Sequence, residues 1–134
     1  MTFLEPKLAE VVGRDARYAY EAYEFMFRAL HHTQKSLGRE LKPDIEPGDA
    51  RLHVRGRELL EGVRLLGLAE FGLLARTVFA MWGIHRTVDF GNIVFNLIEA
   101  GLMSGSDDDS IDDFRDVYDF EQALDYRIQL NEAQ

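Results

Sequence analysis

The chain has 134 residues, a formal net charge of −9 and no cysteine. A single domain of this length can bury a core without a disulfide or a metal to hold it together, and the absence of cysteine excludes disulfide frameworks, thiolate metal sites and cysteine nucleophiles. The acidic balance argues against nucleic acid as a partner, because affinity for phosphates comes largely from lysine and arginine.

Nothing at the start of the sequence predicts export or membrane insertion. Residues 1–12 have no basic segment followed by a long apolar run, so we predict no signal peptide. The longest apolar stretch is interrupted by Glu70, Arg76 and His85, so we predict no membrane span. We therefore expect a cytoplasmic protein.

Two helices are predicted before the first long loop. Leucine and valine at helical spacing predict a short helix over residues 4–12. The longest predicted helix covers residues 15–37, where apolar and aromatic side chains recur at steps of three and four. We expect Asp15 to be its N-cap and Gly38 to end it.

Residues 39–55 have no helical periodicity and contain two prolines, which predicts a long loop. A short strand near residues 52–54 is one alternative. A loop of this length in a small domain is uncommon and often functional.

The central stretch predicts two helices, over residues 57–71 and 73–82, separated by a break at Gly72. Gly62 and Gly67 lie inside the first of them, where glycine weakens a helix by up to about 1 kcal/mol. We expect another part of the chain to pack closely against both glycines.

A helix–turn–helix corner is predicted at residues 73–102. Gly83 and Gly101 are each followed by an apolar residue, the pattern of a Schellman helix end with its apolar contact. Thr87 is expected to cap the helix over residues 88–100.

The C-terminal part begins with an aspartate-rich segment, predicted to be a solvated loop over residues 104–113. Residues 114–118 are expected as a turn, a short strand or one side of a hairpin. Asp119 is the expected N-cap of a last helix over residues 120–130, and residues 131–134 should fray. Together these elements predict a mainly α, single-domain bundle of about five to six helices over residues 1–134.

Histidine and aspartate offer weak candidates for a metal site. The histidine pairs lack the three- or four-residue spacing of helical metal ligands, and the aspartate run places Ile111 and Asp112 where a calcium loop needs a ligand and a glycine. We therefore assign neither a metal nor a cofactor. The histidines considered were His31, His32, His53 and His85.

Two further groups of residues are candidate sites. Four polar residues on the helix over 88–100 share one face, and with two glutamates of the helix over 57–71 they are a candidate for a polar cleft or a solvated helix face. These residues are Asp89, Asn92, Asn96 and Glu99, with Glu58 and Glu61. Trp82, followed by His85 and Arg86, is either a core residue or a surface recognition patch.

A DNA-binding reading of the corner is disfavoured. The helix over residues 88–100 contains no lysine or arginine, and the segment in the place of a wing is the aspartate run. The closest approach to a basic patch is a scattered set: Arg51, His53, Arg55, Arg57 and Arg64.

Several short motifs carry a resemblance: GRELLEG from Gly56, FG from Phe71, WGI from Trp82, DFG from Asp89 and IVFNL from Ile93, followed by DF and VYDF in the C-terminal part. With Tyr18, Tyr23, Phe25 and His53 they cover nearly the whole chain. On these residues the chain resembles a family of bacterial proteins of about this length, found mainly in the planctomycete and verrucomicrobial lineage. The resemblance implies a single-domain bacterial protein and brings no activity, cofactor or partner with it.

The sequence alone therefore favours a non-enzymatic protein that acts through contact with another protein or through self-association along its long aromatic helix. The alternative is a metal- or small-ligand-binding enzyme that uses histidine and the carboxylates of the central helices. If a site exists, we expect it where the central stretch meets the long loop that carries His53.

Overall fold

The computed structural model describes residues 6–40, 42–46 and 49–127. Its α-helices there are α1 (Pro6–Arg14), α2 (Tyr20–Ser36), α3 (Gly56–Phe71), α4 (Ala75–Met81), α5 (Thr87–Glu99) and α6 (Phe120–Ala123), and its 3-10 helices are η1 (Ala50–Leu52), η2 (Gly72–Leu74) and η3 (Ile111–Phe114). These described residues contain no strand, so the mainly α prediction is confirmed and the short strands or hairpin near 52–54 and 114–118 are wrong.

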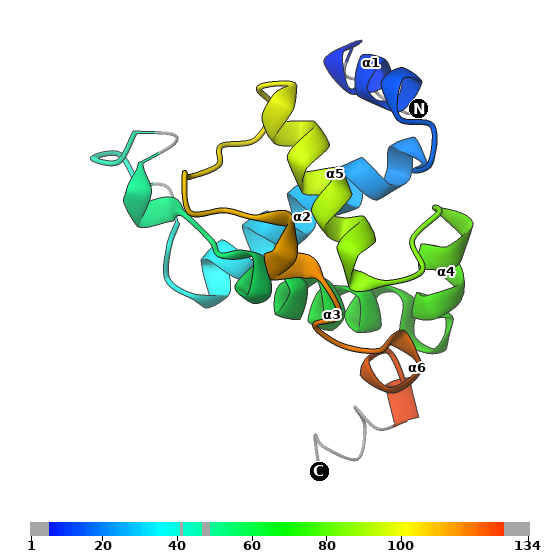
Figure 1. Cartoon of the computed structure of the whole chain (residues 1–134). Helices are drawn as coiled ribbons and strands as arrows, with labels where there is room; N and C mark the ends of the chain where they lie inside the picture. The colour runs from blue at the N-terminus through cyan, green and yellow to red at the C-terminus, as the bar shows by residue number, and fades with distance from the viewer. Residues whose placement is uncertain (1–5, 41, 47–48, 128–134) are drawn as a thin grey trace.

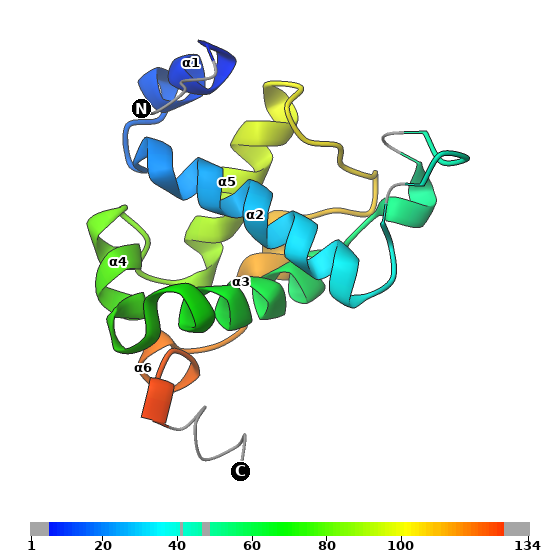
Figure 2. The same ribbon diagram turned by 180° about the vertical axis from the view of Figure 1, so that it is seen from behind.

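Helix α2 is the centre of the arrangement. It packs against both α3 and α5, and α1 packs on α2 as well. Figure 1 shows α5 crossing α2, with α3 below them and α4 at one end of α3. In both views α6 lies below α3, and the loops that precede η1 and follow α5 lie on the side away from α4 (Figures 1 and 2). Within the described residues no helix is long and apolar enough to cross a bilayer.

The core is built around aromatic rings. Phe25 of α2, Phe79 of α4 and Phe90 of α5 are fully buried. The ring centroid of Phe79 lies 5.3 Å from that of Phe25 and 5.2 Å from that of Phe90, both in edge-to-face geometry. Tyr23 of α2 is fully buried as well, so two aromatic side chains of this helix belong to the core.

Glycine ends α4 and α5 as predicted. Gly83 has a φ of 90°, Ile84 N donates to Phe79 O at 2.8 Å, and Gly83 N donates to Ala80 O at 3.0 Å. This is the double hydrogen bond of a Schellman motif, and it satisfies carbonyls that the helix leaves unpaired. Gly101 ends α5 in the same conformation, with a φ of 75°.

Both predicted N-caps upstream of α5 are wrong. Helix α2 begins at Tyr20, after Ala19, and Asp15 instead pairs with Arg17 at 2.8 Å. Thr87 lies inside α5, fully buried, and its hydroxyl donates to Phe114 O at 2.6 Å. Asp15 also accepts from Asn96 of α5 at 2.8 Å, so each of the two side chains has a distant partner in place of the local cap.

The close approaches predicted at the glycines of α3 are present. A Cβ at Gly62 would overlap the hydroxyl of Thr33 on α2, and a Cβ at Gly67 would lie 2.7 Å from the ring of Phe79. These contacts let α3 approach α2 and α4 more closely than a side chain would allow.

The C-terminal prediction is partly correct. Asp119 is the N-cap of α6, and its carboxylate accepts from Glu121 N at 2.8 Å. Helix α6 ends at Ala123, where Leu124 leaves helical geometry and is buried in the core. Tyr126 and Arg127 are again helical, and the rest of the predicted span, 128–130, lies outside the described residues. The predicted frayed tail, 131–134, lies outside the described residues.

Candidate functional site

A pocket of about 540 Å³ lies where the long loop after α2 meets the second half of α5 and the acidic loop. Both loops lie on the same side of the molecule in Figures 1 and 2. The walls come mainly from apolar side chains: Phe27, Leu30, Leu52, Val54, Leu59, Val94, Phe95, Ile98, Leu102, Met103 and Phe114. The polar side chains that reach the pocket are Gln34, Asp49, His53, Ser104, Ser106, Asp108 and Asp109.

A histidine–aspartate pair joins the two loops at this pocket. His53 Nε2 lies 3.2 Å from Asp109 Oδ1, and the side chains are 27% and 18% exposed. Because an ionised carboxylate can only accept, Nε2 carries the proton in this bond. Asp109 Oδ2 accepts from Ser106 N at 2.7 Å, so the carboxylate is held from both sides.

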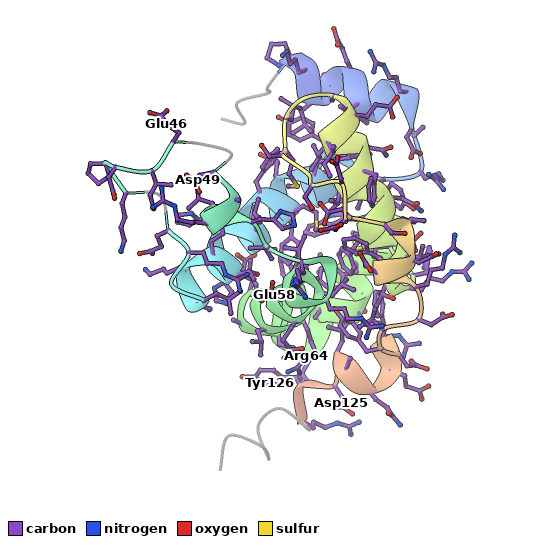
Figure 3. All side chains as sticks on the ribbon, turned by 60° about the vertical axis from the view of Figure 1, so that its left-hand side comes forward. Glu46, Asp49, Glu58, Arg64, Asp125 and Tyr126 are labelled. Carbon is purple, nitrogen blue, oxygen red and sulfur yellow. The ribbon has the colours of Figure 1, made fainter. Side chains whose placement is uncertain are left out.

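The loop that carries His53 is anchored to the helices beside it. Arg39 donates to His53 O at 3.1 Å and to Glu58 Oε1 at 2.8 Å, and Gln34 donates to Leu52 O at 3.0 Å. The bonds from Arg39 and from Arg55 N hold the pKa of Glu58 below its usual range. Through Arg39, Glu58 therefore helps to position the loop that carries His53. Figure 3 shows Glu58 on α3 and Asp49 on the part of this loop that projects from the helices.

Three of the four polar residues on this face of α5 are hydrogen-bonded to the start of α2 and the turn before it, and the fourth, Glu99, is exposed. Tyr18 donates to Asp89 Oδ1 at 2.7 Å, and Asn92 donates to the Tyr18 hydroxyl at 2.9 Å. Asn96 donates to Asp15 Oδ2 at 2.8 Å and to the Tyr23 hydroxyl at 3.1 Å. These bonds attach α5 to the start of α2 and its preceding turn; we call them the tyrosine clasp.

Three members of the tyrosine clasp have shifted pKa values. Burial raises the pKa of Tyr18 to about 12 and also raises the pKa of Tyr23. The Arg17 guanidinium beside Asp15 holds the pKa of that carboxyl well below its usual range. Asp89 Oδ2 accepts from His85 N at 2.9 Å and from Arg86 N at 3.2 Å, so Asp89 takes the capping role predicted for Thr87.

The remaining candidates are not brought together with these residues. Glu61 is exposed and pairs with Arg64 at 2.6 Å; Figure 3 shows Arg64 on α3, above the C-terminal segment that carries Asp125 and Tyr126. Trp82 is half-buried, with its ring centroid 5.6 Å from that of Phe25. The side chains of His85 and Glu99 are exposed. Of the residues proposed as site candidates from the sequence, His53 lines the pocket.

The other histidines are not among the residues that line the pocket. His31 is exposed and His32 half-buried near the end of α2. Among the residues that the structure describes, no group of three or more histidine, aspartate or glutamate side chains is arranged to hold a metal ion. In the scattered basic set, Arg51 is paired with Asp49 and Arg64 with Glu61.

Comparison with known proteins adds no assignment: no family model, curated protein or solved structure matches the chain. The bacterial family resemblance therefore stays a prediction.

Sequence reasoning missed most of this pocket. Phe95 and Ile98 belong to a second apolar face of α5, beside the face that packs in the core. An apolar surface wider than one helix face indicates a second packing partner, and this was the available signal. Asp109 was read as one of several solvated aspartates. Its partner His53 lies 56 residues away, so the pairing follows from the fold and has no local pattern.

Proposed function

We propose that the protein binds a small molecule in the pocket between the two loops. The observation that carries this proposal is the pocket itself: about 540 Å³, with mainly apolar walls and a few polar groups that converge on it. Ligand sites have this size range and this composition. Of the ligand-binding enzyme that the sequence offered as an alternative, this proposal keeps the ligand binding and requires no reaction. We also propose a cytoplasmic location, which a chain without cysteine fits.

Residues outside the pocket lining fix the shape of the pocket. Arg39 and Glu58 fix the backbone around His53, and the Tyr18–Asp89 bond fixes the first half of α5. When a site is already formed before its ligand arrives, binding does not incur the entropy cost of ordering the site. This pre-formed geometry supports the binding of a small ligand.

A matched pair of substitutions tests the proposal. Met103→Trp puts an indole into the pocket, whereas Met81→Trp makes the same change at a position on α4 that is 77% exposed and not part of the lining. Small organic fragments are titrated into each protein, and amide shifts are followed by two-dimensional NMR. We expect fragments to shift the amides of Ile98 and Gly105 in the wild-type and Met81→Trp proteins and to lose this effect in Met103→Trp. Fragments that shift other amides alone, or that bind Met103→Trp equally well, would refute it.

A second candidate function, contact with another protein or a second copy, is supported by a different surface. Leu73, Leu74 and Met81 on η2 and α4 are 71%, 61% and 77% exposed, a concentration of large apolar side chains that is typical of interaction sites. We favour this surface over the aromatic residues of α2, because Tyr23 and Phe25 are buried in the core. Sedimentation and affinity capture should distinguish the wild-type protein from a Leu74→Ser, Met81→Ser variant. Equal behaviour of the two proteins, both monomeric and without specific partners, would end this candidate.

A further inference from the structure

Apart from His53, which is charged only when protonated, the charged side chains that line the pocket carry one sign. Asp49, Asp108 and Asp109 line it, and none of the described lining residues is lysine or arginine. Asp49 is neutralised by Arg51, which contacts both of its carboxylate oxygens at 3.0 to 3.1 Å. Asp108 and Asp109 therefore set the charge that a bound molecule meets.

We propose that the ligand is an organic cation: an apolar skeleton that carries a protonated amine. This inference rests on the proposed small-molecule binding and specifies the ligand class. The apolar body lies against the walls formed by α2, α5 and Phe114, and the ammonium group lies beside Asp109.

Asp109 has the geometry of an acceptor for this group. A carboxylate offers about four lone-pair positions, and the described structure uses one on each oxygen, toward His53 Nε2 and toward Ser106 N. Asp109 N also donates to Ser106 O at 3.0 Å, which closes the turn around the side chain. The carboxylate is thus fixed in place with acceptor capacity left over, and no reorganisation is needed to receive an ammonium.

Asp108 adds a second negative charge at the same end. It is exposed and makes no ion pair with another described residue. Apolar walls concentrate the field of such charges within a cleft. The pocket therefore attracts cations and repels carboxylates and phosphates, and the chain's net charge of −9 acts in the same direction.

The apolar walls select for a hydrocarbon body. Phe27, Phe95 and Phe114 contribute aromatic rings to the lining. Burial of each further methylene against such walls favours binding, so affinity grows with the length of the skeleton. A small hydrated cation gains nothing from this surface, and for this reason the inference names an organic cation and not a metal ion.

Three probes of one chain length test the ligand class: octylamine, octanol and octanoate, titrated by calorimetry near neutral pH at physiological ionic strength. We expect the amine to bind best and the carboxylate worst. Asp109→Asn keeps an oxygen for Ser106 N and removes the charge, so it should weaken octylamine about tenfold and leave octanol unchanged. The matched control is Asp107→Asn, on the same loop but outside the lining, which should change neither.

The outcomes separate the two proposals. If the three probes bind with equal affinity, if octanoate binds best, or if Asp109→Asn and Asp107→Asn behave alike, the cation inference is overturned and small-molecule binding stands. If no probe binds and no fragment shifts the amides of the pocket, both proposals fall. Should Asp109→Asn not fold, Asp108→Asn serves instead, because its exposed side chain has no structural bond to lose among the described residues.

Discussion

Replacement of Gly62 by alanine tests the contact between α2 and α3. A Cβ at this position would overlap Thr33 Oγ1, lie 3.1 Å from Thr33 Cβ and lie 3.6 Å from Ala29 O. Thr33 is itself 4% exposed, and its hydroxyl donates to Ala29 O at 2.7 Å. The new methyl therefore forces either a change of the Thr33 rotamer or a separation of the two helices.

Two effects of opposite sign decide the size of the change. Alanine in place of glycine stabilises a helix interior by up to about 1 kcal/mol. Overpacking of a close contact costs about 1 to 3 kcal/mol, and the displaced Thr33 hydrogen bond adds roughly 1 kcal/mol. The net expectation is a loss of about 1 to 3 kcal/mol in the free energy of unfolding.

Denaturant unfolding followed by Trp82 fluorescence measures this loss, because Trp82 lies in the aromatic cluster of the core. Gly13→Ala is the control: no atom lies within 4 Å of its Cβ position, so a gain of a few tenths to about 1 kcal/mol is expected. The double variant Gly62→Ala, Thr33→Ala should recover at least about 1 kcal/mol relative to Gly62→Ala, since the overlapping hydroxyl is gone. A Gly62→Ala protein as stable as the wild type, or a double variant with no recovery, would show that the contact does not limit the packing.

Two further predictions concern the polar groups of the core. Burial raises the pKa of Tyr18 to about 12 and raises that of Tyr118, whereas tyrosine in an unfolded chain has a pKa of about 10. The stability that these two groups contribute is therefore complete below about pH 10 and is lost as the pH rises toward their pKa values in the folded protein. Tyrosinate absorbance measures the ionisation, and unfolding curves at the same pH values measure the stability. Titration of all five tyrosines near about pH 10 in a folded protein would contradict this. Asp89→Ala removes an acceptor for Tyr18 and for two backbone N–H groups, so we expect a loss of about 2 to 3 kcal/mol, with Asp89→Asn intermediate; a loss below about 0.5 kcal/mol in urea unfolding would count against the capping role.

Helix ends were predictable where the sequence determines them locally. Gly83 and Gly101 end their helices as expected, because a residue with positive φ and the apolar contact beside it lie within a few positions of each other. The N-caps failed for the opposite reason. Asp15 is bonded to Asn96, 81 residues away, and Thr87 to Phe114, 27 residues away. A distant partner of this kind leaves no trace in a local capping pattern.

The same limit explains the candidate site. His53 and the aspartate run were recognised as separate features, and a site was expected where the His53 loop meets the central stretch. The bond between His53 and Asp109 that joins the two loops depends on how α2, α3 and α5 pack, and no local spacing encodes it. Asp89, Asn92 and Asn96 show the reverse case: their shared face was correct, and its hydrogen bonds to Tyr18 and Tyr23 turn a suspected cleft into an internal fastening.

Helix α5 divides these roles along its surface. Its core face, with Phe90, Ile93 and Leu97, is fully buried, and its polar face is fixed to α2 by the tyrosine clasp. The face left over carries Phe95 and Ile98, which line the pocket. Because the first two faces fix the rotation of α5 about its axis, the third is presented to the pocket at a fixed angle, while the loop opposite is tied to the acidic loop through His53 and Asp109. A bound ligand therefore orders mainly the two loops and not the helices. It should protect the amides of residues 102–109 from hydrogen exchange more than those of α5.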